Sequence, residues 1–264
     1  MKNMLLIDKP AGWTSFDVVA KIRGMIRAQY LAQDIKPTKR QLKVGHTGTL
    51  DPFATGLVII LLGDACSQSD EFLKLDKVYE ATVRLGETST TGDPEGEITE
   101  TLDSRFSILD EAHDTASIPA QASSIKHQAS SHVPTGETVE RTLKRFLGTI
   151  TQTPPAHSAI KINGQRAYKL ARAGKPVDMP SRQVTIHSLE LLDYSYPDLK
   201  IRTHVSSGTY IRSLAQDIGQ ALGTGAYCTQ LRRTRVGQYE LDDAVSISQL
   251  ATQLPPLVPP TPPR

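Results

Sequence analysis

The apolar run Leu57-Val58-Ile59-Ile60-Leu61-Leu62 constrains the fold more than any other segment of this chain. A strand with solvent on one face alternates apolar and polar residues, whereas this run is apolar at every position. It therefore predicts a strand that is covered on both faces, in the centre of a sheet. The run is far too short to cross a bilayer, which needs about 20 apolar residues.

The remaining segments predict more strands and several helices. Met4 to Ile7 is typical of a short buried strand, and Val78 to Leu85 alternates in the strand manner. Thr14 to Asp17 has the spacing of a capping box, which predicts the start of a helix. Further strands are predicted at 184–192, 200–205 and 231–239, a hairpin at 159–164, and further helices at 139–147, 168–173 and 209–222. A last short helix is predicted with Ser246 to Gln249 as its capping box. Gly148, Gly174 and Gly223 are predicted to end three of these helices.

One domain followed by a tail is the predicted organisation. Strands and helices are mixed without a regular βαβ rhythm, so residues 1–254 are predicted to form an α+β domain on a mainly antiparallel sheet. Asp103 to Gly136 is poor in large apolar residues, which predicts an insertion or a mobile loop. Pro255 to Arg264 is mostly proline, which predicts an extended tail without packing partners.

Positive charge is concentrated locally in an almost neutral chain. The net charge is +2 over 264 residues, so any surface for a polyanion must come from clustering. Between positions 161 and 182 the only acid is Asp178, and Tyr168 is interleaved with the cations. These cations are Lys161, Arg166, Lys169, Arg172, Lys175 and Arg182, and Arg232, Arg233 and Arg235 form a second cluster. Such clusters are usually a solvated face, but here they are also candidate contacts to phosphate groups.

Cysteines and known motifs exclude several classes of protein. Cys66 and Cys228 are far apart and in no CxxC pattern, which favours two thiols in a reducing compartment. The N-terminus lacks a basic segment followed by an apolar one, so no signal peptide is predicted and a cytoplasmic protein is expected. HExxH, Walker, GxSxG and zinc-ligand spacings are missing, so neither a cofactor nor a metal is expected.

Asp51 lies in the Gly-rich segment Gly45 to Gly56, which predicts an irregular loop. Its glycines allow tight turns and close approach of a ligand. Pro52 restricts the residue before it to extended geometry, so the Asp51 carboxylate is held in place. A held carboxylate can act as a nucleophile without a metal. A turn in which Asp51 is only a cap explains the same pattern, because short motifs are weak signals.

Tyr79 and Arg212 are two further candidates. Tyr79 lies in the alternating strand, where a tyrosine is usually half-buried core with its hydroxyl at the rim. Arg212 lies in the first turn of a predicted helix, after Gly208. A cation is mildly unfavourable at that end of a helix, and a carboxylate partner would explain it. A solvated surface arginine is the common alternative.

These residues and their order resemble the TruB family of tRNA pseudouridine synthases. GHTGTLDPFATG, from Gly45 to Gly56, is similar to the motif that carries the family's catalytic aspartate. Similar to other family motifs are LLIDKPAGWTS from Leu5, KVYEATVRLG from Lys77, PPAHSAIKINGQRAYKLAR from Pro154, SGTYIRSLAQDIG from Ser207 and LRRTRVGQY from Leu231. The motifs follow one another in the family's order over most of the chain, which makes the resemblance specific.

The resemblance implies a fold and a set of site residues. The expected fold is the pseudouridine synthase fold, with a mixed sheet, flanking helices and a central RNA-binding cleft. Asp51 is expected to be the nucleophile, Tyr79 the stacking partner and proton acceptor, and Arg212 the ion-pair partner of the carboxylate. The residues expected to contact the substrate or the charge network are His46, Asp93, Tyr210, Leu231, Lys161, Lys169 and Arg172.

The chain also departs from the family pattern. Thr90 stands where an aspartate is usual in the turn before Asp93. The segment 103–136 is longer and more irregular than usual. Bacterial members often carry a small C-terminal RNA-binding PUA domain, whereas only the proline-rich tail follows here, so no such domain is expected.

The implied reaction needs no cofactor. Pseudouridine contains the same atoms as uridine, with the glycosidic bond moved from N1 to C5 of the base. The expected substrate is the uridine at position 55 in the T-arm of tRNA, and the protein is expected to be a monomer without a guide RNA or a membrane. One rival is a non-catalytic protein that binds or folds tRNA, which would not need Asp51, Tyr79 and Arg212 together. A guide-RNA-dependent synthase is the other rival.

Overall fold

A computed structural model of the protein describes residues 3–101, 133–162, 164–250 and 254. The tail predicted at 255–264 and most of the segment predicted at 103–136 lie outside the described residues. At the end of that segment Thr135 caps a helix whose first residue is Gly136, so the predicted boundary extends too far. Among the described residues, no helix is long and apolar enough to cross a membrane.

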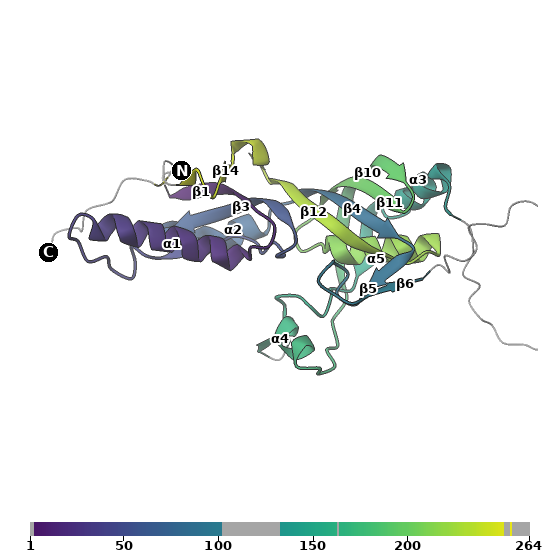
Figure 1. The fold of residues 1–264 in the computed structure, drawn as a ribbon, viewed down its shortest axis with the longest axis horizontal. Coiled ribbons are helices and arrows are strands. Elements are labelled where there is room, and N and C mark those ends of the chain that lie inside the picture. Colours follow the sequence, from purple (N-terminus) through teal and green to yellow (C-terminus); the bar gives the residue numbers. More distant parts are fainter. Residues whose placement is uncertain (1–2, 102–132, 163, 251–253, 255–264) are drawn as a thin grey trace, which may run out of the picture.

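A ten-stranded sheet forms the body of the molecule (Figure 1). Its strands are β1 (Met4–Lys9), β2 (Val44–His46), β3 (Thr55–Leu62), β4 (Lys77–Leu85), β7 (Gly148–Gln152), β10 (Arg182–Ser195), β11 (Asp198–Val205), β12 (Ala226–Val236), β13 (Tyr239–Glu240) and β14 (Val245–Ser246). The order is β14-β1-β3-β12-β4-β11-β10-β7, with β2 beside β3 and β13 beside β12. Only the pairs β1–β14 and β3–β12 are parallel, which confirms the predicted α+β fold on a mainly antiparallel sheet.

The central position of β3 is also confirmed. Val58 and Ile60 pack in the larger hydrophobic core, and Leu57 and Ile59 pack in a smaller core with Phe72. The second core is closed by the short helix α2 (Ser69–Leu73), which follows a 3-10 turn over Gly63–Gln68. A strand needs apolar residues at every position only when both of its faces are covered, and both faces of β3 are covered by these two cores.

The other central strands divide the sheet into two unlike faces. Along β4, Tyr79 and Ala81 are buried in the larger core, whereas Glu80 and Thr82 between them are partly exposed. The buried side is called the inner face and the other side the outer face. The same division continues on the neighbouring strands, because Tyr79 is opposite two other buried residues, Thr203 of β11 and Arg233 of β12.

Two long helices cover the inner face (Figure 1). Helix α1 (Ser15–Leu31) begins at the predicted capping box, in which Thr14 and Asp17 exchange hydrogen bonds. Helix α5 (Ile211–Leu222) ends at Gly223, which is left-handed as expected for a C-terminal cap. Helix α3 (Gly136–Lys144) packs beside α5 and β10.

Three predicted boundaries are wrong. Gly148 does not close α3, which ends at Lys144; it begins β7, a strand that the sequence did not indicate. The basic strand begins at Ala226 rather than Leu231, and Gly237, with φ of +57°, turns the chain into β13. The Gly-rich loop begins with β2 rather than as irregular chain. In each case pairing with a distant strand decided where the strand begins, and such pairing cannot be predicted from the local sequence pattern. Ser246 and Gln249 make the hydrogen bonds of the predicted capping box, but Ser246 ends β14 and a turn follows at 247–249, while residues 251–253 lie outside the described ones.

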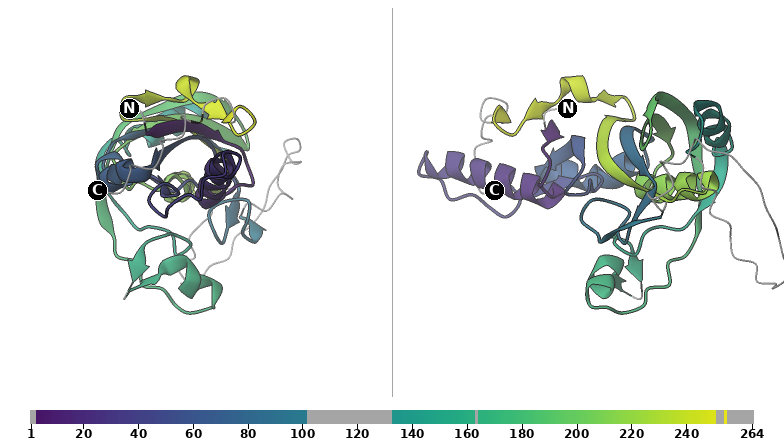
Figure 2. Two further views of the ribbon diagram at one scale, coloured as in Figure 1. Left: turned by 90° about the vertical axis from the view of Figure 1, so that its left-hand side faces the viewer. Right: turned by 45° about the vertical axis from the view of Figure 1, so that its right-hand side comes forward.

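Residues 154–181 form a separate projection, called here the basic lobe. It contains the predicted hairpin as β8 (Lys161–Ile162) and β9 (Gln165–Arg166), followed by α4 (Ala167–Arg172). Figures 1 and 2 show the lobe standing away from the sheet on the side of the inner-face helices. A further hairpin, β5 (Glu87–Ser89) and β6 (Ile98–Glu100), frames the turn that contains Asp93.

Candidate active site

Arg212 and Asp51 form an ion pair on the inner-face side of the sheet. The Arg212 Nε atom lies 3.0 Å from Oδ2 of Asp51. The Arg212 side chain is 3% exposed, whereas that of Asp51 is 30% exposed and so remains accessible to a ligand. The contact is electrostatic rather than a directed hydrogen bond, because the buried Nε–H has no acceptor in the required direction.

The rest of the Arg212 guanidinium group is fully engaged. Nη1 donates to the backbone oxygen of Thr91 at 2.8 Å and to Oδ2 of Asp93 at 2.9 Å. Nη2 donates to the backbone oxygen of His157 at 2.9 Å. One arginine in the first turn of α5 therefore joins the Asp51 loop, the turn before β6 and the base of the basic lobe. The alternative of a solvated surface arginine is wrong.

Asp93 is held as tightly as Arg212. Its side chain is 5% exposed, and Oδ1 accepts hydrogen bonds from Thr91 Oγ1 at 2.5 Å and from the Glu95 backbone N–H at 3.0 Å. Thr90, which replaces the usual aspartate, accepts a hydrogen bond from the Glu97 backbone N–H at 3.0 Å. The substitution thus leaves the turn closed and the carboxylate of Asp93 directed at Arg212.

The pKa of Asp51 is raised above its ordinary value. Burial of the carboxyl group is the largest cause, Arg212 opposes it, and the negative charge of Asp93 adds to it. A carboxylate with a raised pKa is a stronger base and a more reactive nucleophile than a free one, provided that it stays ionised.

Two residues of the N-terminal segment hold the loop on either side of Asp51. Lys9 is fully buried, and its Nζ donates to the Pro52 backbone oxygen at 3.2 Å and to the Trp13 backbone oxygen at 2.6 Å. Burial lowers the pKa of Lys9 to about 8, against the opposing charge of Asp51. The Ser15 hydroxyl accepts a hydrogen bond from the Leu50 backbone N–H at 2.8 Å. Apart from the motif that contains both residues, no sequence pattern indicates these roles.

Arg233 fixes the loop from the other direction. This residue of β12 is 2% exposed and donates to the Leu57 backbone oxygen at 2.7 Å and to the Gly48 backbone oxygen at 3.2 Å. Gly56 lets β12 approach, because a Cβ atom there would lie 2.3 Å from the Arg233 backbone oxygen. Arg233 is thus a structural residue, although the sequence placed it in a cluster of candidate phosphate contacts.

Tyr79 and Leu231 lie on the inner face in the larger core cluster. Tyr79 is 8% exposed and Leu231 is 6% exposed, and Leu231 is opposite Ala81 of β4, which belongs to the same cluster. Leu50 and Ala54, on either side of Asp51, belong to the same cluster. Both residues therefore have the burial expected of core, and they share that core with the Asp51 loop.

His46 and Tyr210 occupy the margins of this site. The pKa of His46 is lowered by burial first and then by the charges of Arg233 and Arg166, so the imidazole is neutral at pH 7. Tyr210 caps α5, and its backbone N–H donates to Oε1 of Gln152 at 2.8 Å. The guanidinium carbon of Arg182 lies 4.9 Å from the centre of the Tyr210 ring.

The cations of the basic lobe are exposed and make few contacts. Lys161, Lys169 and Arg172 all point to solvent, although the Arg172 guanidinium carbon lies 5.7 Å from the Tyr168 ring centre. The charge of Arg172 still reaches the site: burial and then the charges of Asp93 and Asp51 raise the pKa of Glu95, and Arg212 and Arg172 oppose that rise. The structure does not bring these three residues into contact with Asp51.

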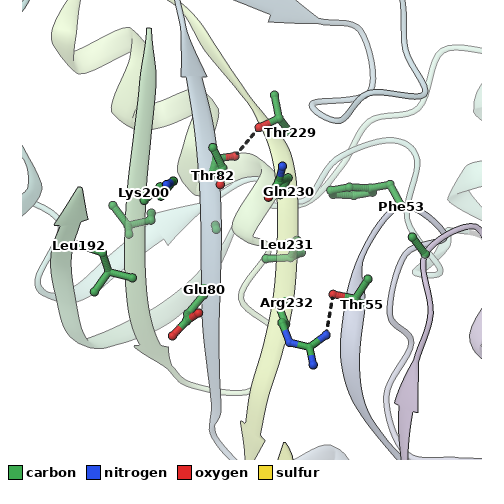
Figure 3. A pocket seen from close by; sticks show the side chains of 13 residues that line it. Phe53, Thr55, Glu80, Thr82, Leu192, Lys200, Thr229, Gln230, Leu231 and Arg232 are labelled. Atoms are coloured by element: carbon green, nitrogen blue, oxygen red, sulfur yellow. Dashed lines mark hydrogen bonds between the residues drawn. The ribbon is translucent and has the colours of Figure 1, made fainter. Parts of the chain in front are cut away.

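A groove of about 430 Å³ lies on the outer face, beside the junction of β3 and β12 (Figure 3). Figure 3 shows Glu80, Thr82 and Arg232 along it, with Arg232 donating to the Thr55 hydroxyl at 3.2 Å. Of the residues predicted from sequence, Leu231 and Arg232 contribute to its lining, whereas Asp51, Arg212 and Asp93 do not. The groove is therefore distinct from the place where Asp51, Arg212 and Asp93 meet. Also on the outer face is a group of Asp76, His187 and His204 with metal-ligand spacing.

Two family models match this chain. One is described as the TruB family pseudouridylate synthase N-terminal domain and matches residues 36–128 and 108–211. The other is described as the tRNA pseudouridylate synthase B C-terminal domain and matches residues 212–255. Together they cover most of the described fold, including Asp51, Asp93 and Arg212.

Curated relatives agree with these matches. The chain is 42% identical over 254 residues to tRNA pseudouridine synthase B of Cupriavidus pinatubonensis (strain JMP 134 / LMG 1197), covering 95% of this chain and 68% of the relative. It is 43% identical over 248 residues to the protein of the same name from Parabacteroides distasonis, covering 94% of this chain and 91% of the relative.

Solved structures share the fold. A Cbf5-Nop10-Gar1 complex contains a chain that matches with a TM-score of 0.61 and 26% identity, covering 95% of this chain and 54% of that chain. An H/ACA RNP bound to a substrate RNA containing 2'-deoxyuridine matches with a TM-score of 0.59 and 24% identity, covering 95% and 52%. The chain thus spans about half the length of these structural relatives.

Proposed function

The chain belongs to the TruB family of pseudouridine synthases, and from that premise we propose that it converts one uridine of tRNA to pseudouridine with Asp51 as the nucleophile. The observation that carries the proposal is the buried Arg212, which contacts Asp51 and Asp93 at once. A protein that only bound or folded RNA would gain nothing from a half-exposed carboxylate held beside a buried cation.

The reaction is an isomerisation. The bond from the ribose C1′ to N1 of uracil breaks, a bond from C1′ to C5 forms, and the proton on C5 is lost while N1 gains one. The target base must first leave its stack, which costs on the order of a few kcal/mol. Contacts in the site recover that cost.

Asp51 supplies the nucleophile through its accessible carboxylate. Lys9 and Ser15 fix the backbone on either side of it, so its position does not depend on the substrate. The raised pKa makes the carboxylate more reactive, and Arg212 limits the rise so that the ionised form is retained. Positioning of this kind lowers the barrier because the geometry is fixed before the substrate arrives.

Tyr79 and Leu231 are proposed to receive the extruded base. Their side chains lie in the core cluster that also contains Leu50 and Ala54 of the Asp51 loop. Stacking on the Tyr79 ring would return about 1–3 kcal/mol of the cost of flipping. The Tyr79 hydroxyl oxygen is proposed to accept the proton from C5 while it releases its own proton to solvent, from which N1 is protonated.

The basic lobe is proposed to hold the RNA backbone. Lys161, Lys169 and Arg172 are exposed on one projection, where phosphate groups can reach them. The lobe is anchored to the site by the hydrogen bond from Arg212 to the His157 backbone oxygen. His46 and Tyr210 are proposed to contact nucleotides beside the target.

The proposed target is the uridine at position 55, in the T-loop. Sequence-specific readers of RNA act mainly on loops, whose bases can be splayed out without melting a helix. An isolated T-arm hairpin should therefore react nearly as fast as whole tRNA in single-turnover assays. A hairpin with a scrambled loop should be inert. The specificity assignment fails if the native hairpin is inert or if the scrambled hairpin reacts.

A single chain without a guide RNA is proposed to be sufficient. The solved H/ACA relatives are complexes, but this chain spans only about half the length of their matching chains. Purified protein incubated with an unmodified tRNA transcript should form pseudouridine by itself. Failure to react until cell RNA is added would favour a guide-dependent enzyme instead.

A further inference from the structure

We propose that Asp76, His187 and His204 form a site for a divalent transition metal, with Zn²⁺ as the best fit, on the outer face of the sheet. Imidazole nitrogens with a carboxylate oxygen are a ligand set that Zn²⁺ accepts. Local motifs could not reveal the site, because its three residues lie far apart in the chain. It plays no part in the chemistry proposed above for Asp51.

The fold brings the three residues together through strand register. His204 lies on the outer side of β11, and Asp76 directly precedes β4, which pairs with β11. His187 lies on β10 at a β-bulge between Ile186 and Ser188. His187 follows the buried Ile186 and so lies on the outer face, and the bulge leaves it beside His204, with the two ring centres 4.7 Å apart.

The distances suit a single bound ion. Nε2 of His187 lies 3.2 Å from Oδ2 of Asp76, and Nε2 of His204 lies 3.8 Å from the same oxygen. All three ligand atoms lie within 4.8 Å of one another. Zn²⁺ binds nitrogen and oxygen at about 2.0–2.2 Å, which places tetrahedral ligand atoms about 3.4 Å apart. Small rotations of the two imidazole rings would bring the set to that spacing.

The surroundings allow the ion to enter and to bind. The three side chains are between 31% and 43% exposed, so the fourth position is open to water. Both Nε2 atoms face the carboxylate rather than backbone oxygens. A neighbouring cation, Arg235 of β12, is opposite Val78 of β4, and its Nη1 lies 3.9 Å from Oε1 of Glu240.

A bound ion would join the chain segments before β4, in β10 and in β11. Asp76 is already fixed by a hydrogen bond from the Gly237 N–H to its backbone oxygen at 2.8 Å. Metal binding to the folded chain alone raises thermal stability by mass action. The melting temperature should therefore rise with Zn²⁺ and should not rise with Mg²⁺, which prefers oxygen ligands.

The test is a calorimetric titration of the whole chain with Zn²⁺, before and after single substitutions. His187→Gln, His204→Gln and Asp76→Asn should each weaken Zn²⁺ binding by about tenfold or more and abolish the Zn²⁺-dependent rise in melting temperature. Asp193→Asn is the matched control, because it removes a carboxylate from β10 that pairs with Lys200 instead. It should bind Zn²⁺ as the unmodified chain does.

The substitutions also separate this site from other histidines. His113, His127 and His132 lie outside the described residues, so binding by the unmodified chain alone does not locate the ion. Equal Zn²⁺ affinity in all four variants and the unmodified chain would overturn the proposal, as would the lack of saturable binding in the unmodified chain. Circular dichroism without metal checks that each variant is folded. Pseudouridine formation should be unchanged in all four, whether or not Asp51 has its proposed role.

Discussion

The cluster around Arg212 and the basic lobe both contain cations, but Arg212 is buried whereas the cations of the lobe are exposed. In the cluster, one buried guanidinium contacts two carboxylates and two backbone oxygens. In the lobe, Lys161 and Lys169 are exposed and Arg172 contacts only a neighbouring ring among the interactions described. The cation of the cluster is paired with carboxylates before any substrate binds, whereas the cations of the lobe can still take phosphate partners.

The difference follows from what each region has to do. A group that reacts must be held in one geometry, and burial with several hydrogen bonds achieves this at the cost of desolvation. A group that binds a flexible polyanion gains from counterion release, which needs exposure rather than order. The comparison predicts that substitutions in the cluster change the rate of reaction and that substitutions in the lobe change affinity for tRNA.

The largest expected effect comes from Asp51→Asn. Loss of the nucleophile should lower kcat by about ten-thousandfold or more, while tRNA affinity stays within a few-fold. Rates are measured by release of the C5 proton and affinity by filter binding. Asp193→Asn, on the outer side of the molecule, should retain the full rate. Multiple turnover by Asp51→Asn would show that the carboxylate is only a cap.

Arg212→Gln tests whether the cluster is structural as well as chemical. Removing the cation leaves Asp51 and Asp93 without their shared partner, and breaking a buried pair costs about 3–5 kcal/mol of unfolding free energy. The rate should fall and the denaturant midpoint should drop. Arg212→Lys should recover part of the stability but little of the rate, because an ammonium group cannot reach all four partners. Unchanged stability in Arg212→Gln would contradict the cluster as described.

Tyr79→Phe separates the ring from its hydroxyl. The substitution keeps the buried ring and should leave tRNA affinity unchanged. If the hydroxyl accepts the C5 proton, the rate should fall by about a hundredfold or more. Tyr239→Phe, in the second core, is the matched control. A rate like that of the unmodified chain would leave Tyr79 with stacking alone.

The acid side of the pH–rate profile gives a finer test. Asp51 must be ionised, so activity is lost as pH falls through its pKa, which burial raises. Asp93 raises that pKa further and Arg212 lowers it. Asp93→Asn should therefore move the acid limb to lower pH. Arg212→Gln should move it to higher pH, and Arg212→Lys, which keeps a positive charge, should move it less. Shifts in the same direction for both sites would exclude Asp51 as the titrating group.

The smallest effect is expected in the lobe. Replacing Lys169 and Arg172 by Gln should weaken tRNA binding and reduce the slope of log affinity against log salt by about 1.4–1.8, if both contact phosphate. The single-turnover rate at saturating tRNA should not change. Replacing Lys74 and Lys200, which are exposed elsewhere, removes equal charge and should leave the slope as it was. An unaltered slope in the lobe variant would mean that this face is merely solvated.

Much of the fold could be predicted because the signals are local. The unbroken apolar run placed β3 in the centre, and the alternation around Tyr79 gave β4 its two faces. The capping box at Thr14 marked one helix end through its side chain, and the glycine at position 223 marked another because its backbone can be left-handed. Strand β7 escaped prediction because only its pairing with β10 makes it a strand.

The sequence by itself determined which residues could react, because the motif around Asp51 and the cation at Arg212 are visible as residue types and spacing. The tertiary structure alone decided what those residues touch. Lys9, Ser15, Arg212 and Arg233 act mainly through backbone oxygens and N–H groups, which every residue carries and no sequence pattern marks. The grouping of Asp76, His187 and His204 likewise depends on register and a bulge. The chemistry of a side chain follows from the residue type alone, whereas its contact partners depend on which distant segments the fold brings together.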